Sequence, residues 1–161
     1  VQGDKLVLEV LKDMGADIQA DAKGIVARSS SLRGRTIDCN DFVDQFTLLA
    51  VVGACAEGET ALVNAEVCRH KECDRVSEMH KALKAMGADV EERRDGLVVR
   101  RSRLRGARLD SRSDHRMVMT LALAGLVASG QTRLANIDCV KKTFPTFVEQ
   151  MAALGCEMQK Q

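Results

Sequence analysis

The chain has 161 residues, of which 45% are hydrophobic, so it can bury one substantial core and a single domain over 1–161 is expected. Lys and Arg total 24 against 23 Asp and Glu, and the net charge of +1 provides no global field that would attract nucleic acid. The longest apolar runs are shorter than the roughly 20 residues that a membrane span requires, so neither a nucleic acid nor a membrane is expected as a partner.

The first part of the chain predicts a helix, a hairpin and a second helix. Apolar residues recur at helical spacing from Leu6 to Met14, and Gly15 is a residue type that commonly ends helices. Short strands are predicted at 17–20 and 25–28. After an S-L-R-G turn and a short extended stretch, residues 42–56 predict a helix that is apolar nearly all round, which is typical of a helix buried inside a domain.

The same elements then recur in the same order. A strand is predicted first, then a helix, two strands, an apolar helix and a further strand, over 60–64, 72–86, 89–92, 97–100, 115–128 and 132–136. Thr143 and Pro145 predict the start of a last helix over 145–154, because proline is well tolerated in the first helical turn.

The recurrence is an internal repeat. At an offset of 72 residues, 11–64 aligns with 83–136 without a gap, and 22 of the 54 aligned positions are identical. The matching segments include LKDMGAD with LKAMGAD, GIVAR with GLVVR, and EGETALVN with SGQTRLAN. Such a period indicates one supersecondary unit stacked on its copy. The predicted class is α/β (α+β), with tandem, circularly permuted β-α-β-α-β-β units, helices inside and sheets outside.

Charged residues gather where the helices are predicted to begin. In chain order these are Asp44, then Lys71, Glu72 and Arg75, then Arg116, then Lys142. The free N–H groups and dipole of a helix N-terminus favour anions, and a cation there is disfavoured by about 0.3–1 kcal/mol. A bound ligand with more than one anionic group would explain these cations, because arginine and lysine hold carboxylate and phosphate.

Two carboxylates add acid–base chemistry to this cluster. Glu72, between Lys71 and Arg75, is either held ionised or serves as a proton carrier, and Asp44 could act as a base. Simpler interpretations remain open. Residues 71–75 could form a solvated helix face, Asp44 could only complement the helix dipole, and 114–116 could be a cap followed by surface charge.

Six cysteines stand at irregular spacings with no C-x-x-C pair, and no signal-like segment precedes them, so reduced thiols and a cytoplasmic location are expected. The series Cys68, His70, Cys73 and His80 contains zinc-ligand types, but its C-x-H-x-x-C-x₆-H spacing matches no common zinc finger. We interpret these cysteines as small buried hydrophobes and expect no metal.

Three motifs in order resemble the C-terminal part of the 5-enolpyruvylshikimate-3-phosphate synthase family. They are RHKECDR at 69–75, DHRMVMTLAL at 114–123 and KKTFP at 141–145, and QGDK at 2–5 also fits. The resemblance implies an inside-out fold of two globes, each made of three β-α-β-α-β-β units. This chain would then hold about two of the three repeats of the C-terminal globe, and its partner would be the N-terminal globe of the same protein. Val1 is not a methionine, which also indicates a piece of a longer protein.

The resemblance also implies an activity. The family transfers the enolpyruvyl group of phosphoenolpyruvate to shikimate 3-phosphate, with release of phosphate, on the route to chorismate and aromatic amino acids. No metal or organic cofactor is implied. By motif, Asp44 and Lys71 would contact shikimate 3-phosphate, with Asp44 also the proton acceptor. Glu72 would be the second catalytic carboxylate.

The remaining roles concern the second substrate. Arg75, Arg116 and Lys142 would hold phosphoenolpyruvate, and His115 would support Glu72. Val67 stands where some family members have a polar residue against shikimate 3-phosphate, so that contact is not carried over.

Two other functions stay open from the sequence. One is an enolpyruvyl transferase acting on UDP-N-acetylglucosamine, which shares the fold. The other is a non-catalytic repeat module that binds a partner or a phosphorylated ligand at these helix starts. Because the other globe would be missing, we expect the 161-residue chain to fold but to have no measurable turnover alone.

Overall fold

Helices and strands alternate along the chain in the order that the repeat predicts. A computed structural model describes residues 6–159, so the QGDK segment at 2–5 lies outside the described residues. The α-helices are α1 (Leu6–Asp13), α2 (Phe46–Cys55), α3 (Arg75–Ala85), α4 (His115–Val127) and α5 (Phe147–Ala153). The strands are β1 (Asp17–Asp21), β2 (Gly24–Arg28), β3 (Thr36–Asp38), β4 (Glu59–Val63), β5 (Asp89–Arg93), β6 (Gly96–Arg100), β7 (Arg108–Asp110) and β8 (Arg133–Ala135). Short 3₁₀ helices are η2 (Val43–Gln45), η3 (Glu66–His70) and η4 (Ile137–Lys142).

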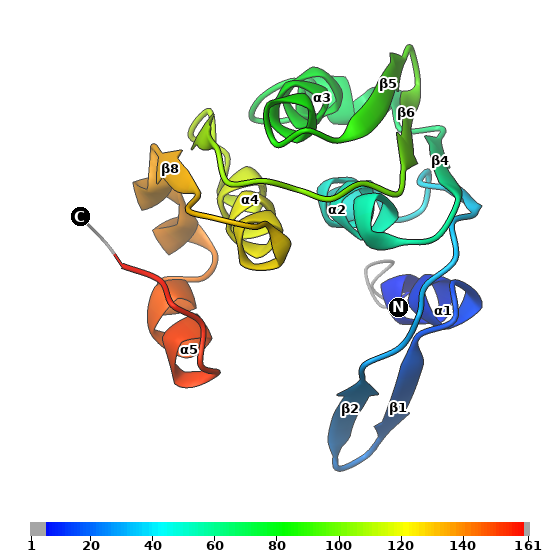
Figure 1. Ribbon diagram of the computed structural model, residues 1–161, viewed down its shortest axis with the longest axis horizontal. Coiled ribbons are helices and arrows are strands. Elements are labelled where there is room, and N and C mark those ends of the chain that lie inside the picture. Colours follow the sequence, from blue (N-terminus) through cyan, green and yellow to red (C-terminus); the bar gives the residue numbers. More distant parts are fainter. Residues whose placement is uncertain (1–5, 160–161) are drawn as a thin grey trace.

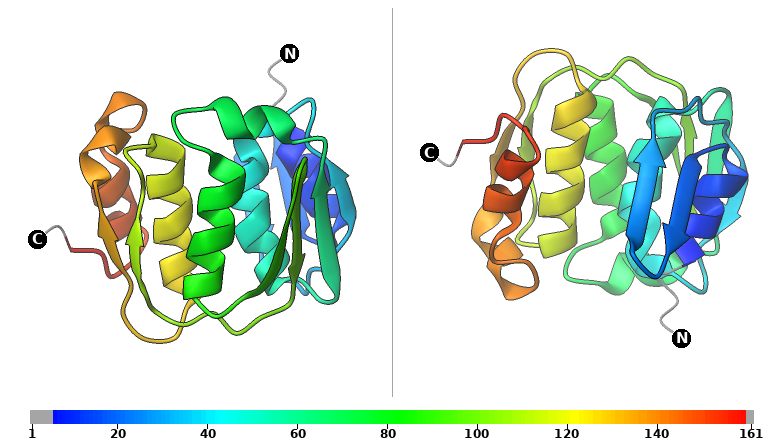
Figure 2. Two further views of the ribbon diagram at one scale, coloured as in Figure 1. Left: turned by 90° about the horizontal axis from the view of Figure 1, so that it is seen from above. Right: turned by 90° about the horizontal axis from the view of Figure 1, so that it is seen from below.

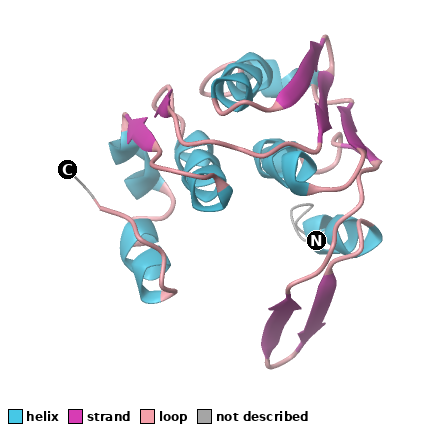
Figure 3. Ribbon diagram, in the orientation of Figure 1, coloured by secondary structure: helices cyan, strands magenta, loops and turns pink. Residues whose placement is uncertain are grey.

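The segment from β3 to β6 is one complete β-α-β-α-β-β unit, as predicted (Figure 1). Its strands form one sheet in the order β3-β4-β6-β5, in which β3 runs parallel to β4 and the other neighbours are antiparallel. Helix α2 packs against β4 and β6, and α3 packs against β5. Two smaller sheets, β1-β2 and β7-β8, complete the strands (Figure 3).

Helices α2, α3 and α4 pack against one another, with the main sheet against α2 and α3 and strand β8 against α4 (Figure 2). Helix α1 has no buried residue, and α5 lies at the outer edge of the molecule (Figure 2). Helix α2 contacts both α3 and α4, and most of its residues are buried. Its sequence has no continuous polar face, so it can only be accommodated where other elements cover it on all sides. Between α2 and α4, the hydroxyl groups of Thr47 and Thr120 are 2.8 Å apart and hydrogen-bonded, which satisfies both polar groups inside the core. The predicted fold class is confirmed.

Helix boundaries differ from the prediction at the charged positions. The predicted helix over 42–56 begins with η2, so Asp44 lies on a 3₁₀ turn before α2. The helix predicted over 72–86 begins at Arg75, because the side chain of Asp74 caps it by accepting a hydrogen bond from Ser77 N (3.0 Å). The last helix begins at Phe147 rather than at 145, and Lys142 ends η4.

Consequently, the expectation that all the charged residues share the first turn of a helix was wrong. Of that set, only Arg75 and Arg116 lie on the first turn of an α-helix. Lys71 and Glu72 lie in the segment between η3 and α3. Asp44 and Lys142 lie on 3₁₀ helices, which the periodicity of apolar residues does not distinguish from α-helices.

The two hairpins of the repeat have similar sequences but different surroundings. Residues of β6 (GLVVR) are buried from Gly96 to Val99, whereas all residues of β2 (GIVAR) are exposed. A Cβ atom on Gly96 would lie 1.8 Å from the carbonyl oxygen of Leu62, so the approach of β6 to β4 requires glycine. The equivalent Gly24 has nothing within 4 Å of such an atom, and among residues 6–159 the only strand that pairs with β2 is β1. The outer edge of β2 is therefore open in this structure.

Within residues 6–159, no helix combines the length and the apolar character needed to cross a membrane.

The buried position of α2 predicts an asymmetric effect of two leucine substitutions. Leu49 is fully buried in α2, whereas Leu126 on α4 is 40% exposed. Leu49→Ala is expected to lower the free energy of unfolding by about 2–5 kcal/mol, because it leaves a cavity in the core. Leu126→Ala, the same chemical change on a helix surface, is expected to lower it by less than about 1 kcal/mol. Urea unfolding followed by circular dichroism measures both, and equal effects would contradict the interior placement of α2.

Candidate active site

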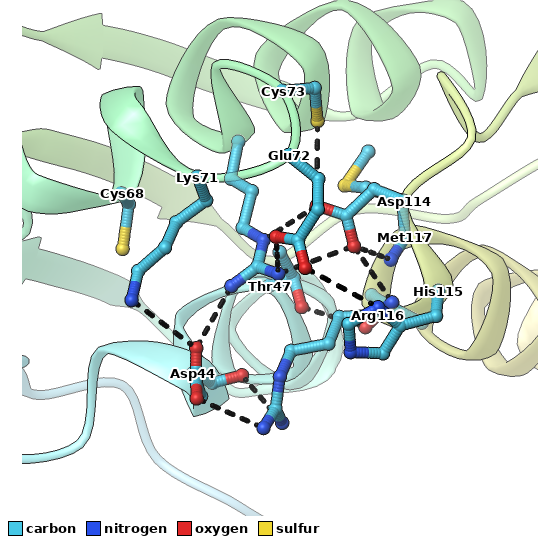
Figure 4. Close-up of polar contacts among 12 residues, drawn as sticks. Asp44, Thr47, Cys68, Lys71, Glu72, Cys73, Asp114, His115, Arg116 and Met117 are labelled. Carbon is cyan, nitrogen blue, oxygen red and sulfur yellow. Dashed lines mark hydrogen bonds and ion pairs between the residues drawn. The ribbon is translucent and has the colours of Figure 1, made fainter. Parts of the chain in front are cut away.

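Charged side chains from three parts of the chain meet where α3 and α4 begin. They come from η2, from residues 71–75, and from residues 114–116 (Figure 4). At this place Asp44, Glu72 and Asp114 supply carboxylates, and the cations that pair with them are Lys71, Arg75 and Arg116. The imidazole of His115 lies beside Glu72. The segments that the sequence separates by up to 72 residues are thus brought into one hydrogen-bonded network.

Arg75 is the centre of this network, and only 1% of the residue is exposed. Its Nε donates to Asp114 Oδ2 (2.8 Å), and its Nη2 donates to Asp114 Oδ1 (3.3 Å). The remaining bonds go to Asp44 Oδ1 from Nη1 (3.0 Å) and to Glu72 Oε2 from Nη2 (2.8 Å). A buried guanidinium must be paired, and here three carboxylates satisfy it. The interpretation of 71–75 as a solvated helix face is therefore wrong for Arg75.

Asp114 is fully buried and performs two tasks with one carboxylate. It pairs with Arg75, and its Oδ1 accepts hydrogen bonds from the backbone N–H groups of Arg116 (2.8 Å) and Met117 (3.4 Å), which makes it the N-cap of α4. Burial raises the pKa of Asp114, but Arg75 and the two backbone donors more than offset this, so that its pKa lies below the ordinary value. Asp114 is therefore ionised at neutral pH.

An irregular turn sets Asp114 in this position. Arg112 and Ser113 both have positive φ angles, of 54° and 58°, a conformation that is uncommon for residues other than glycine. The turn is held by Ser111, whose hydroxyl accepts a hydrogen bond from Ser113 N (3.2 Å) and donates to Asn136 O (2.8 Å). Such strained backbone persists where the surroundings specify it, and it gathers at functional sites.

The Asp44 carboxylate forms ion pairs with cations from two other segments of the site. Its Oδ1 lies 3.0 Å from Arg75 Nη1 and 3.8 Å from Lys71 Nζ, and its Oδ2 lies 3.0 Å from Arg116 Nη2. Partial burial raises the pKa of Asp44, but Arg116, Arg75 and Lys71 together lower it below the ordinary value. About a third of its side chain is exposed, so a ligand can reach it.

Glu72 lies at the open side of the network. One oxygen accepts from Arg75, and the other, Oε1, lies 3.5 Å from His115 Nδ1. The Glu72 side chain is 44% exposed, whereas that of His115 is only 13% exposed. The contact agrees with the predicted pairing of these two residues, although a role for either in chemistry stays a prediction.

A sequence profile of the family described as EPSP synthase (3-phosphoshikimate 1-carboxyvinyltransferase) matches residues 1–151. The chain belongs to the EPSP synthase family. It is 45% identical over 157 residues to the 3-phosphoshikimate 1-carboxyvinyltransferase of Acetivibrio thermocellus, covering 98% of this chain and 37% of that protein. It is 43% identical over 160 residues to the protein of the same name from Methanocaldococcus jannaschii, again covering 98% of this chain and 37% of the relative. The chain thus spans about 37% of the length of these EPSP synthases.

Solved structures give the same result for the fold. EPSP synthase from Acinetobacter baumannii superposes with a TM-score of 0.82 at 31% sequence identity, covering 94% of this chain and 39% of that one. The enolpyruvyl transferase NikO from Streptomyces tendae superposes with a TM-score of 0.77 at 24% identity, which shows a shared fold. The family membership predicted from three motifs is confirmed.

Lys142 is the one predicted site residue that the structure leaves outside the network. It is exposed at the end of η4, and its side chain makes no hydrogen bond or ion pair among the described residues. Its 3₁₀ helix nevertheless packs against α4, the helix that carries Arg116. Its assignment to ligand binding stays a prediction.

The residues weighed as zinc ligands have other neighbours. Cys68 Sγ donates to Val43 O (3.4 Å), Cys73 Sγ donates to Asp114 Oδ2 (3.6 Å), and His80 Nδ1 lies 3.5 Å from Glu92 Oε2. Burial raises the pKa of Cys68 to about 11, and burial together with the charge of Asp114 raises the pKa of Cys73 to about 12. Both thiols are therefore protonated at neutral pH. No group of three or more suitable side chains within 6–159 is placed to hold a metal.

The ion pair of Asp114 with Arg75 was not predicted from the sequence. The D-H-R motif indicates a helix cap, and the cap is present, but nothing in the motif shows that the same carboxylate is the buried partner of Arg75. The signal that could have found it is the pair of arginines at helix starts, since a buried arginine requires an acidic partner of comparable burial.

Substituting Asp114 tests the buried pair. Asp114→Asn retains a capping side chain but removes the charge, so Arg75 keeps fewer anionic partners in a buried place. The free energy of unfolding at neutral pH is expected to fall by about 3–5 kcal/mol, the range found when one partner of a buried pair is removed. Asp17→Asn, which breaks an exposed 3.5 Å pair with Arg28, is expected to cost less than about 1 kcal/mol in the same urea titration.

The effect of Asp114→Asn on the free energy of unfolding should depend on pH. Because the pKa of Asp114 is lowered in the folded state, its contribution is complete above the ordinary Asp pKa of about 4 and is lost as the pH falls through the lower folded value. The stability difference between the wild type and Asp114→Asn should shrink on acidification below about pH 4. A difference that stays constant or grows would show that Asp114 is not held ionised by Arg75.

Proposed function

We propose that this chain supplies one part of the active site of a 3-phosphoshikimate 1-carboxyvinyltransferase. The enzyme would transfer the enolpyruvyl group of phosphoenolpyruvate to shikimate 3-phosphate and release phosphate. The observation that carries the proposal is the convergence of Asp44, the K-E-C-D-R segment and the D-H-R segment in one network, in a chain that belongs to the EPSP synthase family. The A. thermocellus and M. jannaschii relatives bear the name of that enzyme.

Asp44 is proposed to accept the proton of the attacking hydroxyl group and, with Lys71, to contact shikimate 3-phosphate. In the unliganded network Lys71, Arg75 and Arg116 stabilise the ionised carboxylate. Anionic substrates bound to these cations would offset part of their charge and raise the pKa of Asp44. The carboxylate would then be a better base when both substrates are present than when the site is empty.

Arg75, Arg116 and Lys142 are proposed to hold phosphoenolpyruvate. Arg116 is a quarter exposed and points at Asp44 from α4, so it can exchange this carboxylate for a ligand carboxylate or phosphate. Lys142 lies on η4, which packs on α4, and its exposed ammonium group can add a point charge to the same ligand. During the reaction Arg75 would keep its two hydrogen bonds to Asp114 and would contribute its positive charge from the buried side of the site.

Glu72 is proposed to deliver the proton to the methylene carbon of phosphoenolpyruvate, supported by His115. Protonation of that carbon makes the adjacent carbon electrophilic, and the deprotonated hydroxyl of the acceptor adds to it. From the tetrahedral intermediate the methyl group then returns a proton to the Glu72 carboxylate, the enol double bond forms again and phosphate departs with the proton that Asp44 had accepted. The cations of the network stabilise the phosphate and carboxylate charges through these steps. None of the steps asks for a metal or organic cofactor.

The remainder of the enzyme is proposed to lie outside this chain. A further repeat of the same unit would pair with the open edge of β2, since the equivalent β6 is covered by β4. A second globe would close the site from the side where Glu72 and Asp44 are exposed. We place the enzyme in the cytoplasm, where six free thiols remain reduced.

Turnover by the longer protein that contains this chain tests the proposal directly. Phosphate release should require both phosphoenolpyruvate and shikimate 3-phosphate. Replacing shikimate 3-phosphate with UDP-N-acetylglucosamine should abolish it. Release with the nucleotide sugar alone would favour the other enolpyruvyl transferase, and ligand binding without any release would favour an anion-binding module.

Asp44→Asn in that protein is expected to lower kcat on the order of 10²–10⁴-fold while substrate binding persists, because the amide keeps the size of the side chain but cannot accept the proton. Asp41→Asn is the matched control, since Asp41 is an exposed residue on the same segment and outside the network. Steady-state kinetics at saturating substrates measures both. An unchanged kcat in Asp44→Asn would remove Asp44 from the mechanism.

The 161-residue chain alone is expected to show no phosphate release above background with both substrates. Its network offers cations from one side only, and transition-state stabilisation requires the ligand to be enclosed. Measurable turnover by the chain alone would show that the second globe is not needed for chemistry.

A further inference from the structure

Arg69, which lies on η3, binds several acceptors around the start of α3. Its Nη1 donates to both carboxylate oxygens of Asp74, at 3.3 and 3.0 Å, and to Ser77 Oγ at 3.1 Å. The same nitrogen lies 2.8 Å from Glu92 Oε1 on β5. The side chain is only 20% exposed, so these bonds are largely shielded from water. Arg69 therefore joins η3, the cap of α3 and the outer strand of the main sheet.

Two further bonds attach Arg69 to the turn between β5 and β6. Its Nε donates to the carbonyl oxygen of Arg94 (2.8 Å), and its Nη2 donates to the carbonyl oxygen of Arg93 (2.6 Å). Both acceptors are backbone groups, so their positions are fixed by the hairpin and not by a flexible side chain. The guanidinium thus has a rigid support on the sheet.

The segment carrying Lys71 and Glu72 lies between the two partners of the Arg69–Asp74 ion pair. The pair joins residues five positions apart and closes the segment into a loop. Within the described chain, the backbone of 71–73 takes part in none of the hydrogen bonds that join loops and turns elsewhere. Side chains alone must therefore hold the loop.

Asp74 links this loop to the site in a second way. Its Oδ1 accepts from Ser77 N (3.0 Å) and so determines where α3 begins, which places Arg75 as the first helical residue. Losing the charge of Arg69 would leave Asp74 with the cap bond but without the ion pair that ties it to η3.

We propose that Arg69 is a positioning residue for the reaction, acting as a clasp that holds Lys71 and Glu72 at the substrates. The inference rests on the proposed function, since it assigns Arg69 an effect on those two residues. Arginine is required because one planar fork reaches two carboxylates and two carbonyl groups at once. Lysine offers a single charged centre and cannot span these acceptors.

The clasp predicts a distinct kinetic pattern for Arg69→Gln in the longer protein. The kcat should fall on the order of 100-fold, because a displacement of about 1 Å of Glu72 suffices for such a loss. The KM for shikimate 3-phosphate should rise through Lys71. The KM for phosphoenolpyruvate should stay within about threefold, because Arg75 and Arg116 remain held by Asp114 and α4. Arg69→Lys should recover little of the loss.

Arg94→Gln is the matched control. Arg94 lies in the same turn, but its side chain is 87% exposed and pairs only with Glu66 among the described residues. Its kinetic constants should remain within about twofold of the wild type. If Arg69→Gln fails to fold, Asp74→Asn removes the same ion pair while an amide keeps the cap, and it should show the same kinetic pattern.

A readout independent of turnover separates this inference from the proposed function. The N–H groups of Ser77 and Glu78 donate to Asp74, at 3.0 and 2.9 Å. Their amide hydrogen exchange, followed by mass spectrometry, should accelerate by about tenfold in Arg69→Gln, because Asp74 loses its ion pair with η3, and stay unchanged in Arg94→Gln. Unchanged exchange, or a lowered Tm with kcat and both KM values intact, would overturn the clasp. A wild-type protein without turnover, but with accelerated exchange in Arg69→Gln, would instead overturn the proposed function alone.

Discussion

The buried ion pair between Arg75 and Asp114 is the constraint on which the candidate site depends. Arg75 is the first residue of α3 and Asp114 caps α4, so the pair fixes the starts of two helices relative to each other. Neither charge could remain buried without the other. Once the guanidinium is held by Asp114, its remaining N–H groups point at Asp44 and Glu72, and these set the positions of both carboxylates. The arrangement of the site thus follows from satisfying one buried cation.

The repeat explains how one scaffold came to hold opposite charges at one place. Asp44 and Arg116 occupy equivalent positions in the two copies, and their side chains meet at 3.0 Å. Thr47 and Thr120, which are one residue out of the repeat register, are hydrogen-bonded between the same two helices. Equivalent segments therefore face each other across the α2–α4 contact. Substitutions at positions that meet in this way place an anion and a cation side by side.

The sequence predicted the architecture well because periodicity and repetition report on burial. The apolar helix at 42–56, the GLVVR strand and the order of elements all follow from which side chains must avoid water. The starts of helices were less predictable. Whether Asp44 lies on an α-helix or a 3₁₀ helix depends on local hydrogen bonds that apolar spacing does not record. The burial of Asp114 likewise depends on a partner 39 residues away, which no local pattern reveals.

The open edge of β2 has a consequence for the handling of this chain on its own. Its sequence is that of an interior strand, with Ile25 and Val26 exposed at 61% and 51%, and it has no charge, proline or bulge at its centre that would discourage pairing. An unpaired apolar strand edge is a template for the addition of another strand. Two copies could join there through their GIVAR segments and satisfy each other's open backbone groups. The tendency of the chain to associate is therefore determined by a hairpin that contributes no residue to the candidate site, and Val26→Lys would be the natural means of discouraging association there.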